Sequence, residues 1–169
     1  MKVECELKDV FEATMRKLQT TGLLLTSVGS DGKTNVMTIG WGLVGKLWRE
    51  TVFMVAVRPS RYTSKLIEET KEFTVNVPAE GMEETVAYCG KVSGREHDKF
   101  KERDLKIIDG ISVKAPIIED CVAHFECKVV GKYILTPEML SEDVLKTSYP
   151  AGNYSTLFFG KILSILGNK

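Results

Sequence analysis

The residues of this chain whose types and spacing best suit chemistry lie in one short turn, Arg58-Pro59-Ser60-Arg61-Tyr62-Thr63-Ser64-Lys65. The turn directly follows the apolar run 51–57, so a strand is expected to end in a basic, hydroxyl-rich turn that begins a helix. A helix N-terminus offers unpaired N–H groups and a partial positive charge, and the hydroxyls and cations add to both. The turn is therefore predicted to hold a phosphate. The alternative is an ordinary helix with Ser60 as its N-cap and solvated basic residues around it.

Two further segments could complete such a site. Residues 89–100, Cys-Gly-Lys-Val-Ser-Gly-Arg-Glu-His-Asp-Lys-Phe, again place Ser, Gly, Arg and Lys before an expected helix, and Gly94 lets the backbone come close to a ligand. Residues 35–42 end a strand in Thr, Gly, Trp and Gly, so their backbone can lie against a flat ring while Asn35 and Thr38 supply hydrogen bonds. The alternatives are a charge-paired loop and a half-buried Trp–Gly turn without a ligand.

Composition argues against several classes of function. The 169 residues carry 23 basic and 23 acidic side chains, a net charge of zero, which disfavours a general nucleic-acid binder or a cationic membrane-surface protein. No apolar stretch approaches the ~20 residues of a membrane span, and the start Met1-Lys2-Val3-Glu4-Cys5 lacks the apolar core of a signal peptide. We expect a single soluble, cytoplasmic domain over residues 1–169 with neither nucleic acid nor membrane as a partner.

The spacing of Cys121, His124 and Cys127 raises the possibility of a metal site. The surrounding residues read as a strand with period-two alternation, which places Cys121 and Cys127 on one face and His124 on the other. Three ligands divided between two faces do not converge on one ion, so no metal site is expected. The cysteines are interpreted as small core thiols.

The elements that must position these segments can be read from periodicity and turn residues. Strands are expected at 23–28, 34–41, 51–57, 73–77, 121–135 and 156–166, with one or two more in 106–113; helices are expected at 7–19, 62–70, 80–88, 95–103 and from Thr136 to about Lys146. Asp31-Gly32 marks a hairpin turn between the first two strands. Because the strands outnumber the helices and follow in hairpin order, an antiparallel barrel with short helices at its ends is favoured.

Taken together, the three segments resemble the flavin reductase-like proteins, which include the flavoredoxins. The resemblance covers residues 35–41, 57–63, 73–78, 89–90, 93–95, 98–100, 121–128, Tyr154 and 156–160, nearly the whole chain. Each motif alone is weak, and together they are specific. The resemblance implies a mainly β fold with short helices, a six-stranded antiparallel split β-barrel of the FMN-binding type. It also implies a homodimer with FMN bound near the interface.

The resemblance further implies roles for individual residues. The isoalloxazine would be lined by Asn35, Met37, Thr38, Ile39, Gly40 and Trp41. The phosphate and ribityl chain would be held by Ser60, Arg61, Tyr62 and Thr63. The phosphate side would be closed by Ser93, Gly94, Arg95 and Lys99. Arg58 belongs to the same motif, with the direction of its side chain left open. Two positions depart from the pattern: Ser155 stands where a histidine is common, and Lys161 where an acidic residue is common. Both departures argue against a proton-relay or substrate role for that strand.

The implied activity transfers electrons from NADH or NADPH through FMN to a free flavin, a ferric complex or another redox protein. The cofactor carries the difficult chemistry, so the protein has to bind it, leave one ring face open and stabilise negative charge. No catalytic residue is therefore expected. Two alternatives remain: an electron carrier of the flavoredoxin type without nicotinamide activity, and a dimeric interaction module without flavin.

Overall fold

The computed structural model describes residues 2–168 as a mainly β fold with short helices. The helices are α1 (Leu7–Gln19), α2 (Tyr62–Thr70), α3 (Glu83–Lys91), α4 (Lys99–Glu102), α5 (Glu142–Ser148) and the 3-10 helix η1 (Pro137–Met139). The strands are β1 (Lys2–Glu4), β2 (Leu23–Val28), β3 (Thr34–Ile39), β4 (Gly42–Leu47), β5 (Glu50–Val57), β6 (Glu72–Val77), β7 (Ile107–Ile108), β8 (Ile117–Ile118), β9 (Ala123–Ile134) and β10 (Thr156–Asn168).

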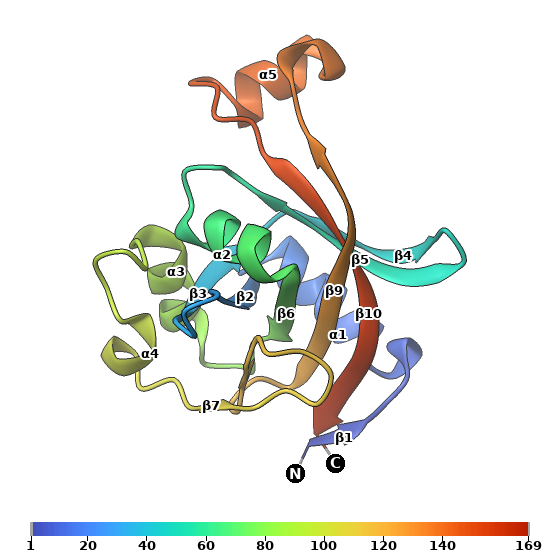
Figure 1. The fold of residues 1–169 in the computed structure, drawn as a ribbon, viewed down its shortest axis with the longest axis vertical. Helices are drawn as coiled ribbons and strands as arrows, with labels where there is room; N and C mark the ends of the chain where they lie inside the picture. Colours follow the sequence, from blue (N-terminus) through green and yellow to red (C-terminus); the bar gives the residue numbers. More distant parts are fainter. Residues whose placement is uncertain (1, 169) are drawn as a thin grey trace.

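The main sheet is antiparallel and is ordered β3-β2-β6-β9-β10-β5-β4, with β1 paired to the far end of β10 (Figure 1). Over residues 2–168 it contains eight strands, so the expectation of six is corrected. The additional strands are β1, which is three residues long, and β4, whose glycines obscured its alternation. The end strands β3 and β4 do not pair in the described chain, so no continuous hydrogen-bonded ladder closes the sheet into a barrel.

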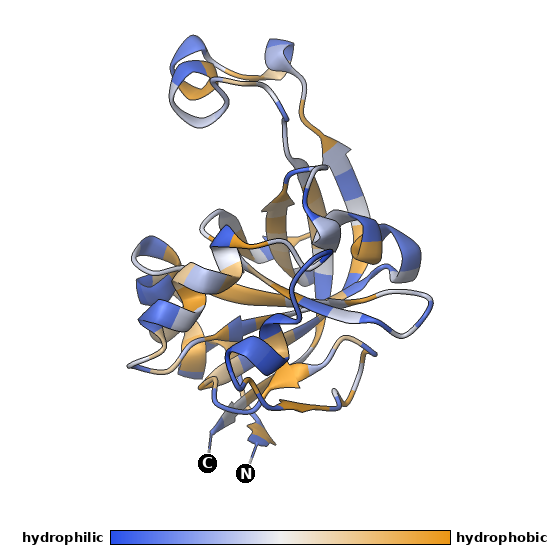
Figure 2. Cartoon of the chain, turned by 90° about the vertical axis from the view of Figure 1, so that its left-hand side faces the viewer, coloured by the Kyte–Doolittle hydropathy of each residue, from blue (hydrophilic) through white to orange (hydrophobic). Residues whose placement is uncertain are grey.

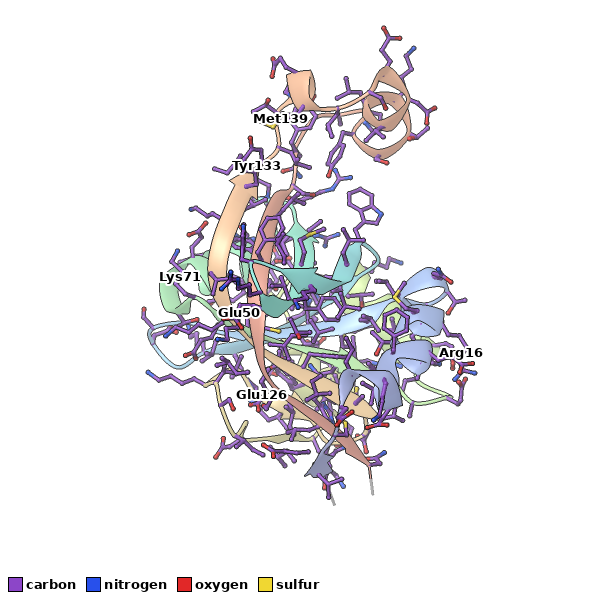
Figure 3. The ribbon with its side chains drawn as sticks, turned by 90° about the vertical axis from the view of Figure 1, so that its right-hand side faces the viewer. Arg16, Glu50, Lys71, Glu126, Tyr133 and Met139 are labelled. Carbon is purple, nitrogen blue, oxygen red and sulfur yellow. The ribbon has the colours of Figure 1, made fainter. Side chains whose placement is uncertain are left out.

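Strands β9 and β10 form the longest ladder, and the other strands of the sheet pair outward from them. β6 pairs with the inner half of β9, and β5 pairs with residues 156–161 of β10. The outer ends of both strands, together with η1 and α5, project from the body as an arm, at the top of Figure 1. Tyr133 and Met139 lie on this arm in Figure 3. The single helix expected from Thr136 is instead two short helices, because Ser141 begins a second one by accepting a hydrogen bond from the Val144 N–H.

Several other boundaries differ from those expected. β3 ends at Ile39 rather than Trp41, α3 begins at Glu83 rather than Glu80, and α4 covers only part of 95–103. β7 pairs with β8, and the sequence pattern did not predict β8. No helix among residues 2–168 is both long and apolar enough to cross a membrane.

The core lies on both faces of the sheet. One cluster contains Phe53, Phe73, Phe125 and Phe158 and is closed by α1; the other lies beneath α3 and α4. Figure 2 shows the hydrophobic colour mainly on strands inside the body. Cys127 belongs to the first cluster and Cys121 to the second, so the prediction that they share a face is wrong. Cys121 precedes β9, and period-two alternation does not extend to it. Residues 2–168 contain no cluster of three His, Cys, Asp or Glu side chains able to hold a metal.

A buried polar layer lies between the sheet and the loop that contains β7 and β8. Asn76 Oδ1 accepts hydrogen bonds from the Ile118 N–H at 3.0 Å and from His124 Nδ1 at 2.8 Å. Since a carbonyl oxygen only accepts, Nδ1 carries the proton, and the buried Nε2 has no partner. Burial, with the charge of Lys2 adding to it, lowers the pKa of His124 to about 3. His124 is therefore neutral in the folded protein at neutral pH.

This burial predicts a specific loss of stability in mild acid. His124 gains a proton in the unfolded chain at its ordinary pKa of 6.5 but in the folded chain only near 3, so stability is full above 6.5 and is lost as pH falls towards 3. The contribution lost from about pH 7 to pH 5 is about 2 kcal/mol. Urea unfolding of His124→Gln should show a shallower decline with pH than the wild type. His97→Gln, which removes a partly exposed histidine, should keep the wild-type decline, and identical slopes for all three proteins would contradict the assignment.

Candidate functional site

Three adjoining hollows lie side by side along β3. The central cavity, about 400 Å³, is lined by Asn35, Met37, Arg58, Ser60, Arg61, Tyr62, Thr63, Val92, Ser93, Gly94, Lys99 and Asn153. The Trp41 cavity, about 160 Å³, is lined by Met37, Thr38, Ile39, Gly40, Trp41, Ala56, Arg58, Arg61 and Ser155. The outer groove, about 680 Å³, begins at Thr34 and Asn35 and extends along residues 94–100. The hollows share lining residues, so they form one elongated depression.

The basic turn between β5 and α2 forms one wall of the central cavity. α2 begins after Arg61, which is its N-cap residue and makes no side-chain capping bond, so the expectation of Ser60 as N-cap is wrong. Ser60 Oγ instead accepts a hydrogen bond from Asn153 Nδ2 at 2.8 Å. Lys65 lies one turn into α2, lines the outer groove rather than the central cavity, and pairs with Glu69 at 3.6 Å.

A three-way junction joins this wall to β3 and to the loop before α4. Asn35 and Thr63 are both buried, and Asn35 Nδ2 donates to Thr63 Oγ1 at 2.8 Å. Gly94 lies against the other side of the same amide, and a Cβ there would lie 1.9 Å from Asn35 Oδ1. Only glycine permits this approach. The junction therefore holds the turn and the 92–99 loop on opposite sides of one cavity.

Four cations line the depression, and a backbone carbonyl accepts a hydrogen bond from each of them. Arg61 donates to Gly90 O at 3.1 Å, Lys99 to Cys89 O at 2.9 Å, and Arg95 to Ser60 O at 2.8 Å. Arg58 donates to Ser148 O at 2.7 Å. Among residues 2–168 no carboxylate lies within 4.0 Å of any of these four side chains. The positive charge is left uncompensated, which favours an anionic ligand.

The pKa of Lys99 is lowered by its surroundings. Its side chain is buried, and burial, with the nearby charge of Arg61 adding to it, lowers its pKa from 10.5 to about 8. The Cys89 thiol acts in the opposite direction but is a weak anion, since burial raises its own pKa to about 11. A negative ligand beside Lys99 would stabilise its charged form.

The Trp41 cavity lies where the arm joins the body. The Arg58 guanidinium lies 5.5 Å from the Trp41 ring centre and 5.1 Å from that of Tyr149, which settles the direction that the sequence left open. The Tyr149 hydroxyl donates to Ser155 Oγ at 3.0 Å. Ser155, at the position where the resemblance leads one to expect histidine, is thus tied to the arm. The second departure, Lys161, forms an ion pair with Glu50 at 2.9 Å, away from these hollows.

The structure brings most of the predicted site residues together. Those lining the central cavity are Asn35, Met37, Arg58, Ser60, Arg61, Tyr62, Thr63, Ser93, Gly94 and Lys99, and the predicted ring segment Thr38, Ile39, Gly40 and Trp41 lines the Trp41 cavity. Arg95 differs: it lines the outer groove, with its guanidinium 5.4 Å from the Tyr62 ring centre. The hydroxyl of Thr38 donates to Val86 O, so it is used to dock α3 on β3.

Sequence reasoning missed Ala56, Val92 and Asn153 as lining residues. Asn153 had a detectable signal, since Gly152-Asn153 is a turn pair and both residues adopt positive φ, 71° and 59°. Val92 lies in the 89–100 segment but was given no role of its own, and no pattern marked Ala56, which is part of β5.

Comparisons with known proteins show the family to which this chain belongs. The family model described as "Flavin reductase like domain" matches residues 15–169, so the chain belongs to the flavin reductase-like family. An uncharacterized protein of Archaeoglobus fulgidus is 38% identical over 98 residues, covering 58% of this chain and 55% of the relative. This chain thus spans about half the length of that relative.

Two solved structures share the fold. A flavoredoxin from Methanosarcina acetivorans has a TM-score of 0.69 and 28% identity, covering 88% of this chain and 69% of its own. An NADH:FAD oxidoreductase of Streptomyces globisporus C-1027 has a TM-score of 0.66 and 20% identity, covering 87% of this chain and 75% of its own. The mainly β antiparallel architecture matches that of split-barrel proteins in this family.

The junction at Asn35 predicts the effect of one added methyl group. Gly94→Ala would force the Asn35 amide away from Thr63 and leave buried polar atoms unpaired, at a cost of roughly 1–3 kcal/mol. Urea unfolding should detect the loss. Gly45→Ala, where a new Cβ meets nothing within 4 Å, is the matched control and should change stability by less than about 0.5 kcal/mol. Equal stabilities for the two variants would show that the junction is not tight.

Proposed function

We propose that this protein is an FMN-binding oxidoreductase that passes electrons from NADH or NADPH through bound FMN to a flavin, a ferric complex or a redox protein. Residues 1–169 act as one FMN-binding unit. The observation that carries the proposal is the convergence of Arg58, Arg61, Arg95 and Lys99 on an elongated depression in a flavin reductase-like chain, with no carboxylate partner among residues 2–168. Bound FMN supplies the electron-transfer chemistry, and the protein supplies binding and orientation.

The residues present fit FMN along the length of the depression. In the central cavity, Arg61 and Lys99 offer charge, and Ser60 and Ser93 offer hydroxyls, for a terminal phosphate. Asn35 and Met37 line the same cavity, and a polar side chain close to an apolar one in the chain suits a ribityl chain. The Trp41 cavity, with Ile39, Gly40 and the Trp41 ring, suits the edge of a flat aromatic ring.

A homodimer is part of the proposal. The Trp41 cavity is only about 160 Å³ and Trp41 is 42% exposed, so one chain encloses little of a three-ring system. The arm exposes Val130, Tyr133, Ile134 and Met139, which are apolar enough to mark an interaction surface. A second copy packed against this arm would enclose the ring end of the site.

A second candidate is an electron carrier without nicotinamide activity. The likeness to a flavoredoxin at 28% identity over 88% of this chain favours it. Both candidates need the same FMN site, and they differ in whether a reduced nicotinamide delivers electrons there.

An absorbance spectrum separates these functions. The purified protein, supplied with FMN, is expected to retain the flavin and to lose its visible absorbance when NADH or NADPH is added anaerobically. Flavin that dithionite reduces while both nicotinamides fail would identify an electron carrier. Colourless protein that takes up no added FMN would refute both proposals and leave an interaction module without flavin.

The proposed phosphate contact of Arg61 predicts a difference between two flavins. Arg61→Ala should weaken FMN binding by about 10- to 100-fold, since a charge-assisted bond contributes ~1.5–3 kcal/mol. Riboflavin lacks the phosphate, and its affinity should change by less than about 3-fold. Titration by fluorescence quenching measures both, with Arg16→Ala on the distant α1 as the control. An equal loss for FMN and riboflavin would place Arg61 elsewhere.

The lowered pKa of Lys99 predicts how FMN affinity depends on pH. The charged form binds phosphate and predominates below about 8, so affinity should be high there and fall as pH rises through 8, by up to about 10-fold at pH 9. Lys99→Arg, which stays charged, should show little decline over this range. A wild-type affinity that is flat from about pH 7 to pH 9 would contradict the role of Lys99.

A further inference from the structure

Arg58 is the cation of the depression to which the proposed function gives no separate role. Arg61 and Lys99 are assigned to the phosphate, and Arg95 lines the outer groove. Arg58 lines both the central cavity and the Trp41 cavity, and the Trp41 cavity is where the proposed function places the edge of the flavin ring. A charge at that position lies beside the part of FMN that accepts electrons.

Three groups hold the Arg58 guanidinium in one place. It lies 5.5 Å from the ring centre of Trp41 and 5.1 Å from that of Tyr149, and it donates to Ser148 O at 2.7 Å. Tyr149 is itself buried and held, because its hydroxyl donates to Ser155 Oγ at 3.0 Å. Contact with aromatic rings suits a guanidinium, which is flat. The charge is therefore in position before any ligand binds, so little reorganisation is needed.

The charge of Arg58 is not neutralised by an acidic side chain. Among residues 2–168, no carboxylate lies within 4.0 Å of Arg58. Its partners are a carbonyl and two aromatic rings, which offer partial charges only. Arg58 is also half-buried, and a charge shielded from water acts more strongly on its surroundings than an exposed one. A negative group beside Arg58 would therefore be stabilised.

The two ends of FMN respond differently to a nearby cation. The phosphate is negative whether the ring is oxidised or reduced, so a cation there favours both states alike. The oxidised ring is neutral, and two electrons taken up with one proton leave the ring with one negative charge at neutral pH. A fixed cation beside the ring therefore favours the reduced state, and charge close to the reacting atoms is one way in which a protein adjusts a cofactor's chemistry.

We infer that Arg58 raises the reduction potential of bound FMN by binding the reduced ring more tightly than the oxidised ring. This inference rests on the proposed FMN site. Tyr149 is a positioning residue: it follows α5 on the arm, lines neither the central cavity nor the Trp41 cavity, and holds Arg58 in place. The arm thus contributes to the electron-transfer chemistry of the body.

The test measures two quantities at pH 7 on FMN-loaded protein: the affinity for oxidised FMN by fluorescence titration, and the reduction potential against a redox dye. Arg58→Gln should weaken binding of reduced FMN about 10-fold more than binding of oxidised FMN, which lowers the potential by about 30 mV. Arg58→Lys keeps a charge and should lower the potential by less than about 3-fold, or about 15 mV. Lys99→Gln and Arg61→Gln remove charges assigned to the phosphate, so they should weaken both states alike and shift the potential by less than about 10 mV.

A pair of variants tests the positioning role of Tyr149. Tyr149→Leu removes the ring that holds Arg58 and should lower the potential by about 3-fold, or about 15 mV. Tyr149→Phe keeps the ring and loses only the hydrogen bond to Ser155, so the potential should stay within about 10 mV of the wild type. A purely structural role would change stability to urea in these variants and leave both potentials unchanged. Because Tyr149→Leu retains Arg58, it also carries the test if Arg58→Gln does not fold.

Three results would overturn the inference. If Arg58→Gln weakens oxidised and reduced FMN equally, Arg58 acts on the phosphate. If it changes neither affinity nor potential, Arg58 only attaches the arm to the body. If Lys99→Gln or Arg61→Gln lowers the potential as far as Arg58→Gln, the total charge of the site sets the potential. Each of these leaves the proposed function standing, whereas wild-type protein that takes up no FMN removes the proposed function and this inference together.

Discussion

One buried hydrogen bond, from Asn35 Nδ2 to Thr63 Oγ1, joins the elements on which the whole site depends. It connects β3, which carries the three hollows, to α2, which carries the basic turn. The close approach of Gly94 to the same amide adds the 92–99 loop and with it Lys99. Because both polar groups are buried, breaking the bond would leave them without solvent to replace it, so the junction is rigid.

This junction makes an electrostatically costly arrangement possible. Burial lowers the pKa of Lys99, and the nearby charge of Arg61 lowers it further. Backbone carbonyls, which have partial charges only, hold these cations in place without neutralising them. A folded protein that keeps cations together in this way gives up some stability and retains a strong preference for an anion.

How much could be predicted depended on how local each signal was. Helix α1, the Asp31-Gly32 hairpin and the start of α2 follow from spacing and turn residues, and the structure confirms them. β4 was missed because it is an exposed edge strand containing Gly42 and Gly45, so it has no buried alternating face. Cys121 was misplaced because alternation was carried past the start of β9. Arg95 was expected to close the phosphate side together with Ser93, Gly94 and Lys99; it lines the outer groove, whereas those three line the central cavity.

The sequence by itself determined the kinds of groups in the site and their order: a basic hydroxyl-rich turn after a strand, a Ser-Gly-Arg loop, and a strand ending in Gly-Trp-Gly. These signals are local, because they consist of short-range periodicity and of the residue types that favour turns. Only the tertiary structure decided that Asn35, Thr63 and Gly94 meet, that Arg58 lies between Trp41 and Tyr149, and that the hollows form one depression. Those facts depend on contacts between residues far apart in the chain, which form only when the long β9–β10 ladder and the helices pack around one core.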